Sequence, residues 1–323
     1  MHKKTRLFTS ALCAFIATML TLTGVASAAD YPERPITLII PFAAGGGTDT
    51  QARIAGTALE RLLGKPLTVV NKTGGKGVIG FSEIAAAKPN GYTLGCLAYP
   101  DVVIPPQYKK TPYKTDDFVY LASFNSTPTC LLLRVDAPYK TLKEFIAYAK
   151  SNPKRVTVAI ASDSHLLSLV MLCEEAGIET STVAYNSGSE ALNALLGGHV
   201  DAAMIAPQFG RIALQEKRPV VGMASAERIK AMPDVPTFKE QGFDVVMMMH
   251  RVFVAPKGTP APMLEVLFKA CDAAAKDQGL IANVEKAGDE YSYMAGPDLD
   301  RYIETMNKRF FPVVQRNSKL FSQ

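Results

Sequence analysis

The chain has 323 residues, with 35 Lys and Arg against 30 Asp and Glu. Lys3, Lys4 and Arg6 stand in the first few positions, and 35 less these three leaves 32, close to charge balance. Such a balance gives no support to a nucleic-acid partner, which calls for a clustered basic face. A chain of about 300 residues is also at the size where one core begins to split into two.

The first 29 residues have the pattern of a cleavable secretory signal peptide. The basic start is followed by an apolar stretch over 7–25, and the small residues 26–28 precede a cleavage point after Ala28 or Ala29. The alternative is an uncleaved membrane anchor, which the Ser and Thr residues scattered through the apolar stretch disfavour. We therefore expect an exported protein that is soluble in the periplasm.

The segment Pro41–Asp49 contains three consecutive glycines between an apolar run and a helical pattern. Glycine lets the main chain approach a ligand closely, because no Cβ stands in the way. Thr48 with Gln51 has the spacing of a capping box. A strand, a glycine turn and a helix start in this order predict an anion site made of backbone N–H groups. The plain alternative is an ordinary strand-to-helix turn.

Further along, short apolar runs alternate with helical patterns, as in βα units around parallel strands. The expected strands are 35–41, 67–71, 92–97, 118–124, 128–135, 156–161, 182–184, 201–206, 219–224 and 246–254. The expected helices are 48–63, 78–87, 141–151, 165–176, 189–197, 260–276, 279–287 and 297–316. Thr141 with Glu144 and Ser187 with Glu190 have capping-box spacing.

Two apolar strands, Thr127–Val135 and Met247–Val254, have no helical pattern beside them. If they pair as a hinge, one lobe is continuous over 130–248. The other lobe is then assembled from 30–129 and 249–323. Lobes joined by two strands suit a clamshell that closes on a ligand.

Two further polar turns, Ala161–His165 and Ala184–Glu190, each follow an expected strand and open a helix. Open α/β sheets place ligands at the carboxyl ends of their strands, so three such turns together favour a binding site. Simple capping of the helices is the alternative for the serines. Asp49 and Asp163 would repel an anion unless their carboxylates point away from it.

Gly75–Gly80 matches the dinucleotide fingerprint GxGxxG. The match follows the second strand, and Asp101 is the only acidic residue near the required spacing, so a tight turn is the better interpretation. No cofactor is expected.

The three histidines of the mature chain lie far apart in sequence, so no metal site is expected either. His165 and Cys173 lie eight residues apart on an expected apolar helix, so we expect them to pack in the core and not to form a catalytic nucleophile pair. The sequence also has no GxSxG motif, which marks the nucleophile turn of many hydrolases. The sequence does not decide whether Cys96, Cys130, Cys173 and Cys271 form disulfides, but their apolar surroundings favour free thiols.

The order of these motifs resembles the substrate-binding receptors of tripartite tricarboxylate transporters, the Bug-type family. The resemblance covers nearly the whole mature chain. It rests on Tyr31–Pro35 with Pro41–Asp49, Val70–Lys72 before the glycine run, Lys88–Leu94, Gly197–Asp201, Pro233–Thr237 and Ala255–Pro260. It implies an α/β, periplasmic-binding-protein-like Venus flytrap in which two α/β lobes are joined by a two-strand hinge.

The resemblance also implies a non-catalytic periplasmic receptor that delivers a small carboxylate to transporter membrane subunits. The ligand would be a di- or tricarboxylate, an aromatic acid or an acidic amino acid. Arg251 is added to the site because a guanidinium from the hinge strand can form a bidentate pair with a second carboxylate. The predicted ligand-binding residues are Phe42, Ala44, Gly45, Gly46, Gly47, Thr48, Asp49, Ala98, Tyr99, Ser162, Ser164, His165, Tyr185, Asn186, Ser187, Ser189 and Arg251.

The chain departs from the family pattern at two places. Asp163 stands where a small neutral residue is common, and His250-Arg251 stands where an aromatic residue is frequent. Both departures bear on the identity of the ligand. The alternatives are an orphan receptor that presents its ligand to a sensor kinase and an exported hydrolase.

Overall fold

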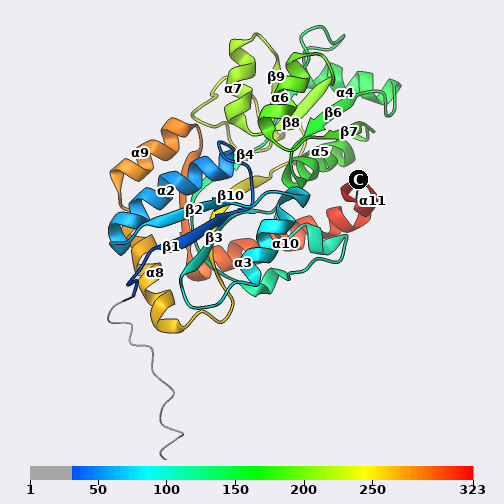
Figure 1. Cartoon of the computed structure of the whole chain (residues 1–323). Helices are drawn as coiled ribbons and strands as arrows, with labels where there is room; N and C mark the ends of the chain where they lie inside the picture. Colours follow the sequence, from blue (N-terminus) through cyan, green and yellow to red (C-terminus); the bar gives the residue numbers. More distant parts are fainter. Residues whose placement is uncertain (1–30, 323) are drawn as a thin grey trace, which may run out of the picture. The chain divides into compact units, whose positions relative to one another are not determined.

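The computed structural model describes residues 31–322. The predicted signal peptide lies outside these residues. Within them the chain builds two separate mixed β-sheets covered by helices (Figure 1). Figure 1 shows α4 to α7 grouped around one sheet, with α2, α3, α8, α9 and α10 around the other. The predicted α/β class is thus confirmed.

The first sheet has six strands in the order β11-β4-β10-β3-β1-β2. β1, β2 and β3 run parallel, whereas β10 and β4 run antiparallel to their neighbours. The strands are β1 (Ile36–Ile40), β2 (Leu67–Asn71), β3 (Thr93–Tyr99), β4 (Phe118–Pro128), β10 (Met248–Pro256) and β11 (Glu290–Ala295).

The second sheet has five strands in the order β7-β6-β8-β5-β9. β7, β6 and β8 are parallel, and β5 pairs antiparallel with both β8 and β9. The strands are β5 (Cys130–Leu133), β6 (Thr157–Ile160), β7 (Ser181–Ala184), β8 (Ala202–Ile205) and β9 (Val220–Met223).

The helices follow the strands as βα units, and most begin at a residue whose side chain or proline favours a helix start. The Thr141–Glu144 capping box forms as predicted. The helices are α2 (Gly47–Leu63), α3 (Val78–Ala85), α4 (Leu142–Ser151), α5 (Asp163–Ala176), α6 (Gly188–Leu196), α7 (Pro207–Gln215), α8 (Ala261–Ala274), α9 (Gln278–Ala287), α10 (Gly296–Arg316) and α11 (Ser318–Phe321). The sequence did not predict α7, α11 or β11.

The predicted hinge strand 127–135 is wrong as one element, because the chain changes sheet at Thr129. Proline has no N–H to donate to a strand ladder, and β4 ends at Pro128. β10 pairs with β4 and not with β5, its Met248 lying opposite Pro128. The two crossings are nevertheless bonded to a common residue, because Ala224 N donates to Thr129 O and Met247 N donates to Ala224 O, each at 2.9 Å.

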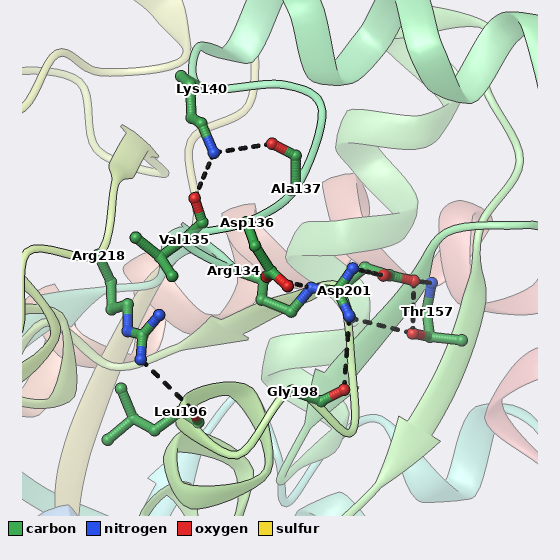
Figure 2. Close-up of polar contacts among 10 residues, drawn as sticks. All are labelled: Arg134, Val135, Asp136, Ala137, Lys140, Thr157, Leu196, Gly198, Asp201 and Arg218. Carbon is green, nitrogen blue, oxygen red and sulfur yellow. Dashed lines mark hydrogen bonds and ion pairs between the residues drawn. The ribbon is translucent and has the colours of Figure 1, made fainter.

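A polar cluster holds the amino ends of β6 and β8 (Figure 2). Asp201 accepts hydrogen bonds from the backbone N and Oγ1 of Thr157 at 2.9 and 2.8 Å, and it forms an ion pair with Arg134 at 3.4 Å. Arg134 also pairs with Asp136 at 2.8 Å, and Lys140 Nζ donates to Ala137 O at 2.7 Å. These contacts tie the loop after β5 to the parallel strands. The opposite, carboxyl ends of β6 and β8 carry none of these contacts and lie beside a cavity.

Candidate functional site

One cavity of about 340 Å³ receives the N-termini of four helices. α2 comes from the first sheet, whereas α5, α6 and α7 come from the second. The lining residues are Phe42, Ala43, Ala44, Gly45, Gly46, Gly47, Thr48, Ala98, Asp101, Ala161, Ser162, His165, Asn186, Ser187, Gly188, Ser189, Ala206, Gln208, Phe209, Met249 and Arg251. The three polar turns that the sequence singled out therefore meet in one place.

The start of α2 differs from the predicted capping box. The helix begins at Gly47 with Gly46 as N-cap, so Thr48 lies inside its first turn and makes no cap. The first helical bond is from Thr50 N to Gly46 O at 2.9 Å. The N–H groups of Gly47 and Thr48 precede it and have no acceptor within the helix. Gly45 takes a φ of 75°, which glycine adopts at little cost.

Asp49 points away from the cavity. Its Oδ2 accepts from Gly45 N at 2.9 Å and from Arg53 Nε at 3.0 Å, and its Oδ1 accepts from Asn71 Nδ2 at 2.9 Å. Burial acts to raise the pKa of Asp49, but these hydrogen bonds outweigh it and leave the pKa below its ordinary value. The carboxylate organises the turn and does not line the cavity.

At the start of α5, His165 is a neutral hydrogen-bond donor. Burial, with a smaller effect of Arg251, lowers the pKa of His165 to about 3. Its Nδ1 accepts from Ala161 N at 3.2 Å, which places the ring proton on Nε2. Ser162 caps the helix by accepting from His165 N at 3.4 Å. Both residues line the cavity.

Asp163 and Ser164, the first two residues of α5, contact residues that precede β4 in the chain. Asp163 Oδ2 accepts from the hydroxyl of Tyr108 at 2.9 Å, and its Oδ1 lies 3.0 Å from Lys76 Nζ. Ser164 N donates to Asp101 Oδ1 at 2.7 Å. The carboxylate of Asp163 thus points away from the cavity, where it would otherwise repel an anion.

The start of α6 keeps two N–H groups free of helical acceptors. Ser187 Oγ accepts from Glu190 N at 3.2 Å, and the first helical bond is from Ala191 N to Ser187 O. Gly188 N and Ser189 N precede that bond. The predicted capping box is half formed, because Glu190 reaches the backbone N of Asn186 at 3.1 Å in place of that of Ser187.

The fourth start, that of α7, escaped the sequence analysis. Ala206 is the N-cap and Pro207 occupies the first helical position, where its missing N–H costs nothing. Gln208 follows and reaches toward α2, since a Cβ built on Gly47 would lie 3.3 Å from Gln208 Nε2. The sequence signal that could have predicted this helix start is Ala206-Pro207 directly after the apolar run of β8.

Arg251 enters the cavity from β10, where it pairs with Ala98 of β3. The register between β10 and β4 shifts between His250 and Val252, and such irregularities redirect side chains beside binding sites. Arg251 is 5% exposed, and its Nε and Nη1 are buried without a hydrogen-bond partner in the described part of the chain.

Asp101 is a lining residue that no local pattern predicted. It is 2% exposed, and burial raises the pKa of its carboxyl to about 6, with hydrogen bonds from Ser164 opposing the shift. It stands just after β3, in the turn that follows Tyr99 and Pro100.

Four predicted residues do not line the cavity: Asp49, Tyr99, Ser164 and Tyr185. Successive strand residues point to opposite faces, so when Ala98 lines the cavity Tyr99 faces α10. Its hydroxyl donates to Ile303 O at 3.3 Å and to Asn307 Oδ1 at 3.1 Å. Tyr185 lines a smaller neighbouring pocket beside the 74–77 turn.

The GxGxxG match is a tight turn, as expected. Gly74, Gly75, Lys76 and Gly77 all have positive φ, and α3 begins directly after them. A Cβ on Gly80 would lie 2.7 Å from Pro41 Cα, so this glycine permits close packing of α3 on the end of β1.

Cys96, Cys130, Cys173 and Cys271 are separate thiols in the described structure. Within residues 31–322 no group of His, Cys, Asp and Glu side chains is placed to hold a metal ion. No helix in that range is long and apolar enough to cross a membrane.

Two sheets joined by two crossings, with a cavity among four helix N-termini, define a periplasmic-binding-protein-like receptor. The chain belongs to the tripartite tricarboxylate transporter family receptors, whose family model matches residues 51–318. The resemblance drawn from the motifs is thereby confirmed.

Individual relatives agree with this assignment. A UPF0065 protein of Cupriavidus necator is 32% identical over 286 residues, which are 88% of each chain. The periplasmic binding protein BugD is 28% identical with a TM-score of 0.79, over 90% of this chain and 99% of that one. MatC of Rhodopseudomonas palustris, solved with bound malate, is 28% identical with a TM-score of 0.79, over 88% of this chain and all of that one (100%).

Proposed function

We propose that this protein is a periplasmic receptor that captures a small organic carboxylate in the cavity and delivers it to the membrane subunits of a tripartite tricarboxylate transporter. Family membership supports the transporter as partner, and the malate bound by MatC supports a carboxylate as ligand. The receptor is non-catalytic in this proposal. Its periplasmic location rests on the family and on the signal-peptide pattern of the first 29 residues.

The observation that carries the proposal is the convergence of four helix N-termini on one cavity. All four N-termini present the positive end of a helix dipole, and those of α2 and α6 add N–H groups without a helical acceptor, which together favour an anion. The N–H groups of Gly47, Thr48, Gly188 and Ser189 are the proposed backbone contacts. Ser162, His165 and Ser187 add side-chain donors.

The remaining predicted contacts follow from the same lining. Phe42, Ala44 and Ala98 supply apolar surface, and Asn186 adds an amide group. Because the donors come from both sheets, a bound carboxylate links the proposed lobes, 30–129 with 249–323 and 130–248. Pro32–Gln323 form one compact unit of contacts, so these limits stay a prediction.

A thermal-shift screen tests the proposal with di- and tricarboxylates, aromatic acids and acidic amino acids, each paired with its neutral amide. A ligand that binds only the folded state raises the melting temperature, by the equivalent of about 2.7 kcal/mol at a hundredfold excess over Kd. Recovery of the acid unchanged after incubation distinguishes a receptor from an exported hydrolase. If no acid shifts the melting curve more than its amide does, the proposed function is wrong.

A further inference from the structure

Arg251 is a buried charge in the cavity that forms no ion pair with any described residue. Its side chain lies on β10 with 5% of the residue exposed, and Nε and Nη1 have no hydrogen-bond partner among residues 31–322. Burying a charge without a partner is costly, and proteins normally pair such a group. An unpaired guanidinium in a ligand cavity indicates that its partner arrives with the ligand.

The surroundings of Arg251 add positive potential to this charge. A Cβ built on Gly47 would lie 2.9 Å from Arg251 Nη2, so the guanidinium sits against the N-terminus of α2. A cation at the positive end of a helix dipole is unfavourable. An anion shared by Nη2 and the first N–H groups of α2 would satisfy both at once.

Two buried carboxylates, those of Asp101 and Asp289, lie near enough to Arg251 for its charge to act to lower their pKa values, against the effect of burial. Asp101 accepts from Ser164 N at 2.7 Å, and Asp289 accepts from Asn125 Nδ2 at 2.6 Å. Within residues 31–322 neither carboxylate forms an ion pair with Arg251. His165 is neutral and offers a donor. Among the described residues Arg251 thus has no ion-pair partner, and the nearby carboxylates offset its charge only in part.

A second set of anion donors comes from the other sheet. Gly188 N and Ser189 N at the start of α6 have no helical acceptor, and Ser162 and His165 of α5 lie in the same cavity. One carboxylate at α2 and Arg251 leaves this second set unsatisfied. A volume of about 340 Å³ accommodates a chain of several carbon atoms between two carboxylates.

We propose that Arg251 is the specificity-determining residue of this receptor, and that it selects a dicarboxylate by binding one carboxylate together with the α2 N-terminus while the α6 N-terminus receives the other. The inference rests on the proposed function and narrows its ligand class. A monocarboxylate satisfies only one of the two donor sets. A third carboxylate would lie in a cavity that already contains Asp101, so a tricarboxylate is disfavoured.

Isothermal titration calorimetry provides the test, with malonate, succinate, glutarate and adipate against propionate, butyrate, valerate and hexanoate, and with citrate as the tricarboxylate. Wild-type protein is expected to bind at least one dicarboxylate about tenfold or more tightly than its monocarboxylate counterpart and than citrate. Arg251→Met is expected to abolish that preference, because it should lower the affinity for dicarboxylates far more than the affinity for monocarboxylates. Lys257→Met is the control, because it removes the same charge just after β10, where Lys257 pairs with Asp116 outside the cavity.

A second readout separates recognition from folding. Since Arg251 is a buried charge without a partner, ligand-free Arg251→Met is expected to melt at a higher temperature than wild type. The proposal is overturned if Arg251→Met keeps wild-type dicarboxylate affinity, or if the wild type prefers monocarboxylates or citrate. If no acid of any class binds the wild type, the proposed function itself fails.

Discussion

Lys76 Nζ lies 3.0 Å from Asp163 Oδ1 and joins the glycine turn after β2 to the first residue of α5. Asp163 is 1% exposed, and the hydroxyl of Tyr108 donates to its other oxygen at 2.9 Å. Lys76 itself has a φ of 57°, uncommon for a residue with a side chain. Two unusual features of the sequence, Asp163 and the GxGxxG turn, thus serve one contact between elements of the two sheets.

The first prediction concerns this pair. Lys76→Met should lower the free energy of unfolding by about 2 kcal/mol, because it leaves Asp163 buried with the Tyr108 bond alone. Adding Asp163→Asn should restore part of the loss, since no uncompensated charge then remains. Urea denaturation measures both variants.

Lys72→Met is the matched control for that experiment. Lys72 pairs with Glu83 at 3.2 Å, and both side chains are well exposed, so its loss should cost less than about 1 kcal/mol. Equal destabilisation by Lys72→Met and Lys76→Met would show that the buried pair has no special role.

The second prediction concerns Asp101. Burial raises the pKa of Asp101 to about 6 from an ordinary value of 3.8, so the folded state holds this proton more firmly than the unfolded state. Its contribution to stability is full below 3.8 and is lost as the pH rises through about 6. Asp163 raises this pKa further and Arg251 lowers it, while His165 stays neutral.

A bound anion should raise the pKa of Asp101 again, so that ligand binding takes up a proton and weakens as Asp101 ionises. Asp101→Asn keeps the acceptor for Ser164 N and removes the charge. The ratio of its affinity to that of wild type should increase from about pH 5 to about pH 7.5. Taking the ratio cancels the ligand's own titration. A ratio that stays constant across this range would contradict the prediction.

The third prediction concerns the glycines at the start of α2. Gly46 has an ordinary φ of −74°, and its missing Cβ would meet Ala43 O at 3.1 Å, away from Arg251. Gly47 is the residue that faces Arg251 Nη2. Gly47→Ala should therefore preserve the fold and weaken carboxylate binding about tenfold, about 1.4 kcal/mol by calorimetry.

Gly56→Ala in the same helix supplies the control. A Cβ at Gly56 meets only Leu67 and Leu38 at 3.8 and 4.0 Å, which are ordinary contacts. This variant should gain up to about 1 kcal/mol of stability and bind normally. If Gly47→Ala also binds normally, the approach of the ligand to the α2 backbone is not as proposed.

Local patterns predicted most elements because apolar periodicity and helix starts are local properties. β11 escaped because Glu290–Ala295 is an edge strand that, among the described strands, pairs with β4 alone, and β4 is far away in sequence. The break at Thr129 escaped because Thr127 and Pro128 directly precede the apolar run Cys130–Leu133, and only the pairing partners assign the two segments to different sheets.

The sequence predicted those parts of the site that lie at recognisable helix starts. Ser162, Ser187 and the 45–48 turn carry local signals, and all reach the cavity. Asp101 and Gln208 enter it through the arrangement of strands and crossings, which no local pattern encodes. Asp49 and Tyr99 lie outside the cavity lining, because contacts with other elements decide which way their side chains point.

The last prediction is that a dicarboxylate draws the two sheets together. The proposed donors lie on both: α2 and Arg251 on the first, and α6 on the second. The crossings at Thr129 and Met247, both bonded to Ala224, supply few residues about which such a motion can occur. Small-angle scattering should show a smaller radius of gyration at saturation with the preferred dicarboxylate. Arg251→Met at the same ligand concentration should keep the ligand-free profile, because the ligand then loses its ion pair with the first sheet. An unchanged wild-type profile at saturation would mean that binding occurs without closure.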